Sequence, residues 1–358
     1  MTNLPLFVGL DYHQSSVQVC VMDSMGSVLI NRSCPNHWQV IRDIVPRTPS
    51  RVAIEACTGA SDLAQELVDK AGWSIDLAHT TYVARMKRQP DKTDFSDARM
   101  LADLTRVGYL PKVWLPPLYI RDLRRLVSLR QSLVQQRTAA KLRITSLLRD
   151  HRIASPCSRW SKRWLLWVQD KNTLPAVGRL IACELLDHLR DLQRRIDRVE
   201  DQMQLFTSTD PIVRFLQTLP SVGPVTAWSL RAAIGDITRF KNGKQLAHYC
   251  GLSPANASSG KRIADAGLVS SGDTHLRGVL MELAHRLSRT QPRWKAFKQT
   301  LKARGKPGAL IAAGIANRYI RALYHPWKQA QLSPDKEPSC EPAQEIIPTQ
   351  TGEVLSRR

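Results

Sequence analysis

The sequence predicts an α/β domain at the N-terminus, built on a mixed sheet, followed by an all-α arm and a mainly α C-terminal domain. Three observations lead to this prediction. Strand-like patterns fill residues 5–33, strands then alternate with helices, and long helical periodicity dominates the chain after about residue 120. At 358 residues the chain has room for two or three domains with substantial cores.

The N-terminal 115 residues supply the strands of the predicted sheet. Three runs, "LFVGLDY", "SSVQVCVMD" and "SVLINRS", read as consecutive antiparallel strands, and the turn "SMG" joins the last two. A short helix in "NHWQVIRDIV", a buried strand "RVAIEAC", an amphipathic helix "SDLAQELVDKAG" and a strand "SIDLAHT" follow. Antiparallel strands succeeded by β-α-β units are the order of ribonuclease-H-like domains, so we assign residues 1–115 to such a domain, ending near "WLPPLY".

Helices are expected to dominate the remaining chain. Apolar spacing predicts one long helix from Ile120 to about Asp150 and another over 174–206, and together they form a coiled-coil arm, 116–206. In the C-terminal domain, 207–330, "LPSVGPVTAWSLRAAIGDITRF" resembles a helix-hairpin-helix, with Gly223 and Pro224 opening its second helix. Residues 331–358 are rich in Pro, Glu, Ser and Gln and are expected to be a disordered tail.

The charge of the chain favours a polyanionic partner. The formal net charge is +21, and residues 120–163 hold twelve Lys or Arg against two acids, Asp122 and Asp150. Neutralising phosphates releases counterions, so nucleic acid is the leading partner and an acidic membrane surface the second. A solvated helix surface is the structural alternative for this segment.

The composition also excludes several classes of protein. Seven cysteines occur without a C-x-x-C pair, which argues against a zinc ribbon and a disulfide framework and favours a reducing, cytoplasmic setting. The N-terminus lacks a signal-peptide pattern and no window approaches 18 uninterrupted apolar residues. We therefore expect neither export nor membrane insertion.

Four carboxylates stand where the predicted topology would bring them together. Asp11 ends the first strand, Glu55 ends the fourth, and Asp94 and Asp97 lie three apart at a helix start in "DKTDFSDARM". Clustered carboxylates repel one another unless a divalent cation neutralises them, and Mg²⁺ prefers such oxygen ligands. Each acid also has a structural alternative, as a helix cap, a partner of the helix dipole or a strand end.

A second candidate site lies in a loop rich in serine and glycine. In "GLSPANASSGKRIADAGLVSSGDTHLRGVL", residues 251–280, small residues precede a helix that we expect to begin near Asp273. Ser258 or Ser259 could attack phosphorus if a base or a metal activated it. A flexible loop without a catalytic role is the structural alternative.

Taken in order, these motifs resemble the DEDD transposases of insertion-sequence family 110. The resemblance rests on "GLD" at Asp11, "IEACTGA" at Glu55, "KTDFSDARMLA" at Asp94 and Asp97, and then "LPSVGPVTA", "YCGLSP" and "SSGDTHLR". It covers about residues 5–325. It implies a RuvC-like N-terminal domain, a helical arm and a C-terminal transposase domain with a nucleophilic serine.

The resemblance also implies a set of functional residues and partners. The metal ligands would be Asp11, Glu55, Asp94 and Asp97, holding Mg²⁺ or, in its place, Mn²⁺, and the nucleophile would be Ser259, with Ser258 as the alternative. The partners would be donor and target DNA and a noncoding bridge RNA. The protein would assemble as a homo-oligomer, dimer to tetramer, in the bacterial cytoplasm, associated with the nucleoid when active. Its active site would combine the acids of one protomer with the serine of another.

Two other functions fit parts of the same sequence. A RuvC-like nuclease or junction resolvase would use the acids and metal-activated water and leave the serine loop structural. A non-enzymatic nucleic-acid-binding protein would need only the positive charge. Dependence on the serine distinguishes the first from a transposase, and dependence on Mg²⁺ distinguishes the second.

Overall fold

The computed structural model describes residues 4–86, 93–256, 265–269 and 272–332. The chain forms two compact units, Met1–Pro116 and Pro117–Arg358. The first unit contains a mixed sheet and the second is mostly helical, as the sequence predicts. Division of the second unit into an arm and a transposase domain stays a prediction.

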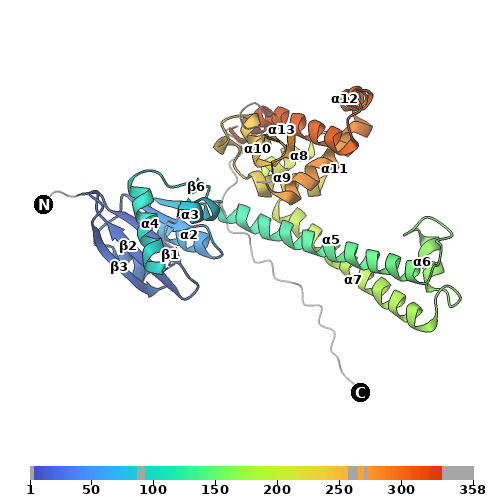
Figure 1. Cartoon of the computed structure of the whole chain (residues 1–358), viewed down its shortest axis with the longest axis horizontal. Helices are drawn as coiled ribbons and strands as arrows, with labels where there is room; N and C mark the ends of the chain where they lie inside the picture. The colour runs from blue at the N-terminus through green and yellow to red at the C-terminus, as the bar shows by residue number, and fades with distance from the viewer. Residues whose placement is uncertain (1–3, 87–92, 257–264, 270–271, 333–358) are drawn as a thin grey trace, which may run out of the picture. The chain divides into compact units, whose positions relative to one another are not determined.

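The sheet of the first unit has six strands in the order β3-β2-β1-β4-β5-β6 (Figure 1). Its strands are β1 (Phe7–Tyr12), β2 (Ser16–Met22), β3 (Val28–Pro35), β4 (Arg51–Glu55), β5 (Ile75–Ala78) and β6 (Lys112–Val113). The first three strands pair antiparallel, whereas β4 runs parallel to both β1 and β5. This confirms the predicted meander and β-α-β units. The short antiparallel edge strand β6 was not predicted, because two residues carry no periodic signal.

Four helices accompany this sheet: α1 (Trp38–Ile44), α2 (Ala60–Ala71), α3 (Thr80–Met86) and α4 (Asp94–Arg106). Alternation along β1 sends Val8 and Leu10 to one face, where they are buried in a core with residues of α1 and α2. The intervening residues Gly9 and Asp11 therefore belong to the opposite face. Helix α4 packs on that face, where Ala98 and other small side chains form the contact.

Gly9 allows α4 to lie directly on the sheet. A Cβ atom at this position would lie 2.0 Å from the Ala98 carbonyl oxygen and 2.5 Å from the Ala102 backbone nitrogen. Neighbouring strands contribute only Cys20 and Ala53 beside it, and both are fully buried. The approach of the helix backbone is thus set by the absence of a side chain at one strand position.

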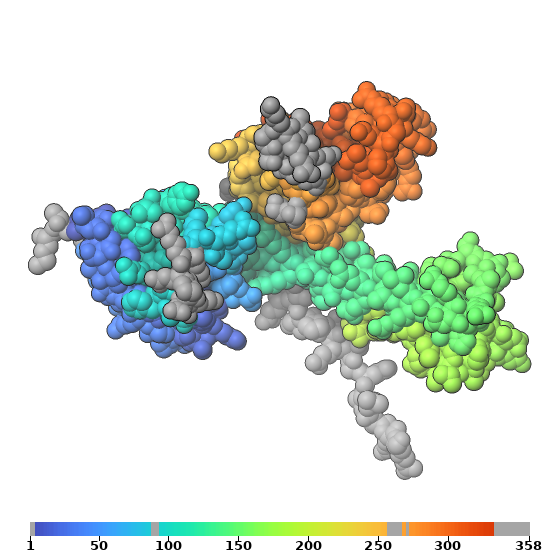
Figure 2. Space-filling model, in the orientation of Figure 1, coloured from blue at the N-terminus to red at the C-terminus, as the bar shows by residue number. Residues whose placement is uncertain are grey.

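The second unit opens with two long antiparallel helices, α5 (Leu118–Asp150) and α7 (Ala176–Phe206), which run side by side in Figure 1 and form a continuous green band in Figure 2. Arg130 Nε lies 2.7 Å from Glu200 Oε1, and Arg137 Nη1 lies 2.5 Å from Gln193 Oε1. These contacts advance along α5 as they retreat along α7, which establishes the antiparallel pairing. Helix α6 (Lys162–Gln169) packs Trp164 into their shared core.

Apart from one short hairpin, the remaining elements share one hydrophobic core with the first turns of α5. They are α8 (Pro211–Gln217), α9 (Pro224–Ile234), the 3-10 helix η1 (Ile237–Arg239), α10 (Gly243–Tyr249), the hairpin β7 (Pro254–Asn256) and β8 (Asp265–Leu268), α11 (Thr274–Thr290), α12 (Pro292–Ala303) and α13 (Gly308–Leu332). Helix α9 opens at Pro224, as predicted. Helix α13 continues two residues into the segment expected to be disordered, and the rest of that segment lies outside the described residues. Among the residues described, no helix is both long and apolar enough to span a membrane.

A buried ion pair ties α8 to α9. Arg231 Nε donates to Asp210 Oδ2 at 2.7 Å, and the two side chains are 9% and 1% exposed. Asp210 Oδ1 caps α8 by accepting from Ile212 and Val213, while Arg231 Nη1 donates to the Gly235 carbonyl at 2.6 Å. Both charges are therefore satisfied by several partners, which buried ions require.

Replacing Gly9 with alanine tests the close packing of α4. The added methyl group has no room against Ala98, so we expect Gly9→Ala to lower the free energy of unfolding by about 1–3 kcal/mol. Gly278→Ala is the control, because that glycine lies exposed within α11 and a Cβ there meets nothing within 4 Å. Thermal unfolding of the full chain gives the comparison, and an unchanged midpoint for Gly9→Ala would contradict the packing described.

Removing one partner of the buried pair should destabilise the second unit. Asp210→Ala leaves the Arg231 guanidinium buried without its carboxylate and removes the cap of α8, so we expect a loss of roughly 3–5 kcal/mol in denaturant unfolding. Asp187→Ala breaks only an exposed pair with Arg190 and should cost less than about 1 kcal/mol. Equal losses in the two variants would show that the buried pair has no special weight.

Candidate active site

Asp11 and Glu55 lie at the same end of two neighbouring parallel strands. The β1–β4 register pairs Gly9 with Ala53 and Leu10 with Ile54, and each carboxylate residue follows directly in its own strand. Leu10 and Ile54 are buried in the core on the α1–α2 face. The two carboxylates therefore leave the sheet on the opposite face, the one that α4 covers.

The other two acids belong to the first turn of α4. Thr93 caps the helix: its Oγ1 accepts from the Ser96 backbone N–H, and Ser96 Oγ accepts in return from the Thr93 N–H. Asp94 is the first helical residue and not the cap, which removes one structural alternative for it. Asp94 is 58% exposed at its side chain, whereas Asp97 is buried at 5%. Both gain from the helix dipole.

A polar bridge fixes the start of α4 to the sheet. Gln18 on β2, the strand partner of Asp11, donates from Nε2 to Asn31 Oδ1 at 2.7 Å. Asn31 Nδ2 then donates to the Phe95 carbonyl in the first turn of α4 at 3.1 Å. This chain of hydrogen bonds holds the acidic helix start against β2 and β3, and β2 is the neighbour of the strand that carries Asp11.

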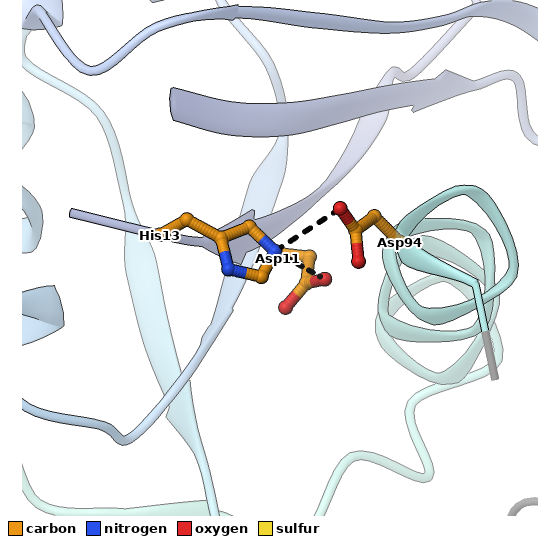
Figure 3. A group of neighbouring side chains, drawn as sticks. All are labelled: Asp11, His13 and Asp94. Carbon is orange, nitrogen blue, oxygen red and sulfur yellow. Dashed lines mark ion pairs between the residues drawn. The ribbon is translucent and has the colours of Figure 1, made fainter. Parts of the chain in front are cut away.

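His13 connects the two acidic elements (Figure 3). Its Nε2 atom lies 3.4 Å from Asp11 Oδ2 and 3.2 Å from Asp94 Oδ2. His13 is not among the site residues that the sequence predicts. The available signal was its position two residues after Asp11, the spacing at which strand side chains share a face, but His13 lies just beyond the end of β1.

The Cys57 thiol is influenced by both Glu55 and Asp11. This thiol lies in the turn between β4 and α2. Burial raises its pKa, and the Glu55 and Asp11 carboxylates raise it further. Both acids therefore act on the same side chain at the end of the sheet, and Cys57 stays a neutral thiol there.

Of the four predicted acids, the structure brings Asp11 and Asp94 into one compact group that does not include Glu55 or Asp97. Among the described residues, Asp11, His13 and Asp94 form a group whose ligand atoms lie within 4.8 Å of one another, and this group fits a divalent cation. Glu55 adjoins it through the strand register, and Asp97 lies in the same first turn of α4 as Asp94. Neither of these two belongs to the group itself.

The two candidate serines, Ser258 and Ser259, lie outside the described residues. The strands that flank them, β7 and β8, pair antiparallel, with Pro254 opposite Leu268. The helix expected after the loop is confirmed as α11, whose cap Asp273 accepts from the backbone N–H groups of residues 275 and 276.

Some of the positive charge predicted to contact phosphate is used inside the protein. Arg124 on α5 donates to the carbonyls of Ala232 and Ala233 at the end of α9, and burial lowers its pKa. Arg130 is paired with Glu200. The basic segment 120–163 therefore combines structural arginines with exposed ones such as Arg143 and Arg149.

Two protein-family models match this chain, one over each of the segments that hold the candidate residues. Residues 8–153, which include the acidic cluster, match the IS110 DEDD model described as "Transposase". Residues 213–299, which include the serine hairpin, match the model described as "Transposase IS116/IS110/IS902 family".

Related proteins extend the similarity over most of the chain. A probable family 20 transposase of Pseudomonas aeruginosa is 29% identical over 331 residues, covering 88% of this chain and 95% of the relative. The transposase for insertion sequence element IS1111A of Coxiella burnetii is 25% identical and covers 87% of each chain. A pilin gene-inverting protein of Moraxella bovis is 27% identical over 65% of each. With both family models matched in order, the chain belongs to the IS110/IS116 family of transposases.

Proposed function

We propose that this transposase cuts and rejoins DNA through a serine nucleophile and a Mg²⁺-bound acidic cluster, guided by a structured RNA. The observation that carries the proposal is the meeting of Asp94, at the start of α4, with Asp11, at the end of β1. Asp11 and Asp94 are 83 positions apart in the sequence, yet they meet in one acidic group of a chain whose net charge is +21. The sheet order supports a ribonuclease-H-like, RuvC-like domain.

The donor atoms of the cluster suit a hard divalent cation. Asp11, Glu55, Asp94 and Asp97 offer carboxylate oxygens, the ligands that Mg²⁺ and Mn²⁺ accept. Bound Mg²⁺ would supply charge stabilisation at the scissile phosphate. Asp94 is the ligand most open to solvent, and Asp97 and Gln18 are buried beside it.

His13 has a separate role in this proposal. Its ring lies between Asp11 and Asp94 and bridges their oxygens, so it holds the helix start and the strand end at one separation. An imidazole is a less suitable Mg²⁺ ligand than a carboxylate. We therefore assign His13 to positioning the two acids.

Ser259, or Ser258 in its place, would attack a DNA phosphate. The new serine–phosphorus bond would replace the bond to the departing 3′ or 5′ oxygen, so bond energy is retained for rejoining. The acids and the serine belong to different compact units of the chain. We propose that the site is composite, with the acids of one protomer and the serine of another, in a dimer or tetramer.

The partners follow from charge and from relatives. The excess of 52 Lys and Arg over 31 Asp and Glu suits donor and target DNA and a bridge RNA. The name of the Moraxella bovis pilin gene-inverting protein supports site-specific recombination as the reaction class. Such a protein would act in the bacterial cytoplasm, on the nucleoid.

Metal binding can be measured without any nucleic acid. We expect millimolar Mg²⁺ to raise the thermal midpoint of the full chain, because a ligand of the folded state stabilises it, and we expect Asp11→Asn to abolish that rise. Asp43→Asn, which alters an exposed acid paired with Arg42, is the control and should retain it. If Mg²⁺ raised the thermal midpoint of Asp11→Asn as much as that of the wild type, Asp11 would not be a Mg²⁺ ligand and the proposed metal site would be wrong.

The nucleophile can be identified by trapping. With flanking-region RNA, Mg²⁺ and junction DNA, the wild-type protein should give a covalent protein–DNA adduct on a denaturing gel. Asp94→Asn and one of Ser259→Ala and Ser258→Ala should reduce it at least about 100-fold, as expected when a catalytic group is removed. Cleavage of DNA with no adduct in any variant would instead establish hydrolysis by water.

A further inference from the structure

A second charged site lies in the C-terminal unit, where residues of α10, α12 and α13 line it. A cavity of about 690 Å³ opens there. Its lining contains four side chains that carry a positive charge and one histidine: Lys244, Arg293, Arg318, Arg321 and His325. No Asp or Glu lines it.

This concentration of charge is not balanced nearby. The sequence from Leu283 to Leu332 contains eleven Lys or Arg and no Asp or Glu. Within the described part of the chain, none of the four cations that line the cavity has a carboxylate partner. Like charges held together without a counter-charge repel one another, so an anion entering the cavity would be stabilised.

The packing of the helices brings the charged side chains of the cavity together. Arg318, Arg321 and His325 follow one another at helical spacing along the exposed side of α13, opposite the buried Ile320 and Trp327. The Arg318 guanidinium lies 4.2 Å from the centre of the Phe297 ring on α12.

The start of α10 packs tightly behind the same cations. A Cβ atom at Gly243 would lie only 2.7 Å from the Arg321 carbonyl oxygen, so Lys244 is brought directly beside α13. The backbones of α10 and α13 are therefore in close contact next to the charged lining.

A second, mainly apolar cavity adjoins the first. It measures about 510 Å³ and shares Lys244, Arg318 and Arg321 with the charged cavity. Its other walls are largely apolar side chains from the hairpin, α12 and α13: Leu252, Pro254, Leu268, Leu301, Leu310 and Ala313. Leu310 is 45% exposed although it is a large apolar residue. A charged pocket thus continues into an apolar slot.

We infer that the two cavities bind an unpaired nucleotide of single-stranded DNA, with its phosphate at the cations and its base in the apolar slot. A base has an apolar face that is accessible only when the base is unstacked, whereas a duplex presents phosphates and base edges alone. Charge complementarity alone would accept any polyanion; the adjoining slot selects a single strand.

The position of the slot indicates which strand it receives, an assignment that rests on the proposed function. Pro254 and Leu268, which face each other across β7 and β8, both line the slot. Ser259 follows Pro254 by five residues, a reach of at most about 18 Å. A DNA strand whose phosphate approaches that serine passes the slot within a few nucleotides. The two cavities would therefore hold the unpaired DNA beside the cleaved phosphate.

The test measures equilibrium binding of a fluorescein-labelled 15-nucleotide single-stranded DNA in EDTA. Neither Mg²⁺ nor cleavage enters this measurement, so its outcome is independent of the acidic cluster and of the serine. We expect Arg321→Gln to raise the Kd about five- to tenfold and to reduce the salt slope by about 0.7. Leu310→Asn should raise the Kd about threefold by making the slot polar.

Matched variants distinguish binding in the two cavities from binding to any basic surface. Arg289→Gln removes the same charge from an exposed position of α11 that lines neither cavity, and Leu166→Asn alters an exposed leucine of α6. Both should bind the oligonucleotide like the wild type. Equal losses in Arg289→Gln and Arg321→Gln would overturn the assignment. So would a duplex of the same sequence competing as well as the single strand, or a loss confined to single-stranded RNA.

Discussion

The contact between α4 and the sheet is the constraint on which the candidate active site depends. Gly9 has no side chain, so the helix backbone at Ala98 and Ala102 rests directly on β1. This contact sets the distance between α4 and β1. Asp11 is the next residue of β1 on the same face of the sheet. The hydrogen bonds from Gln18 through Asn31 to Phe95 then fix where the helix begins. Asp94 meets His13 and Asp11 as a consequence of these two contacts.

The same arrangement reduces the electrostatic repulsion among the carboxylates of the site. Asp94 and Asp97 lie at the positive end of a helix dipole, and His13 interacts with two carboxylates at once. These interactions offset part of the repulsion among the acids before a cation is bound. The cluster can therefore be present in the folded chain and still favour a divalent ion. The buried pair of Asp210 and Arg231 serves the second unit differently, because it only joins two helices.

Much of the fold could be predicted because its patterns are local. The alternation in β1 to β3, the uninterrupted helix from Leu118 to Asp150 and the acids at the start of α4 each follow from residues close in sequence. His13 could not be predicted as part of the site, because its role depends on α4 crossing the end of β1. The charged cavity combines Lys244 with residues of α13 far along the chain, and no local pattern announces it. The assignment between Ser258 and Ser259 stays a prediction, since both lie outside the described residues.

In the proposed composite site, the acids of the first unit and the serine of the second act on one phosphodiester and come from different protomers. Mixing two inactive proteins, Asp94→Asn and Ser259→Ala, tests it most directly. If the site is composite, the mixture regains covalent DNA attachment. The DNA is then joined only to the Asp94→Asn chain, which retains the serine. Attachment to the Ser259→Ala chain, or a mixture as inactive as either variant alone, would contradict it.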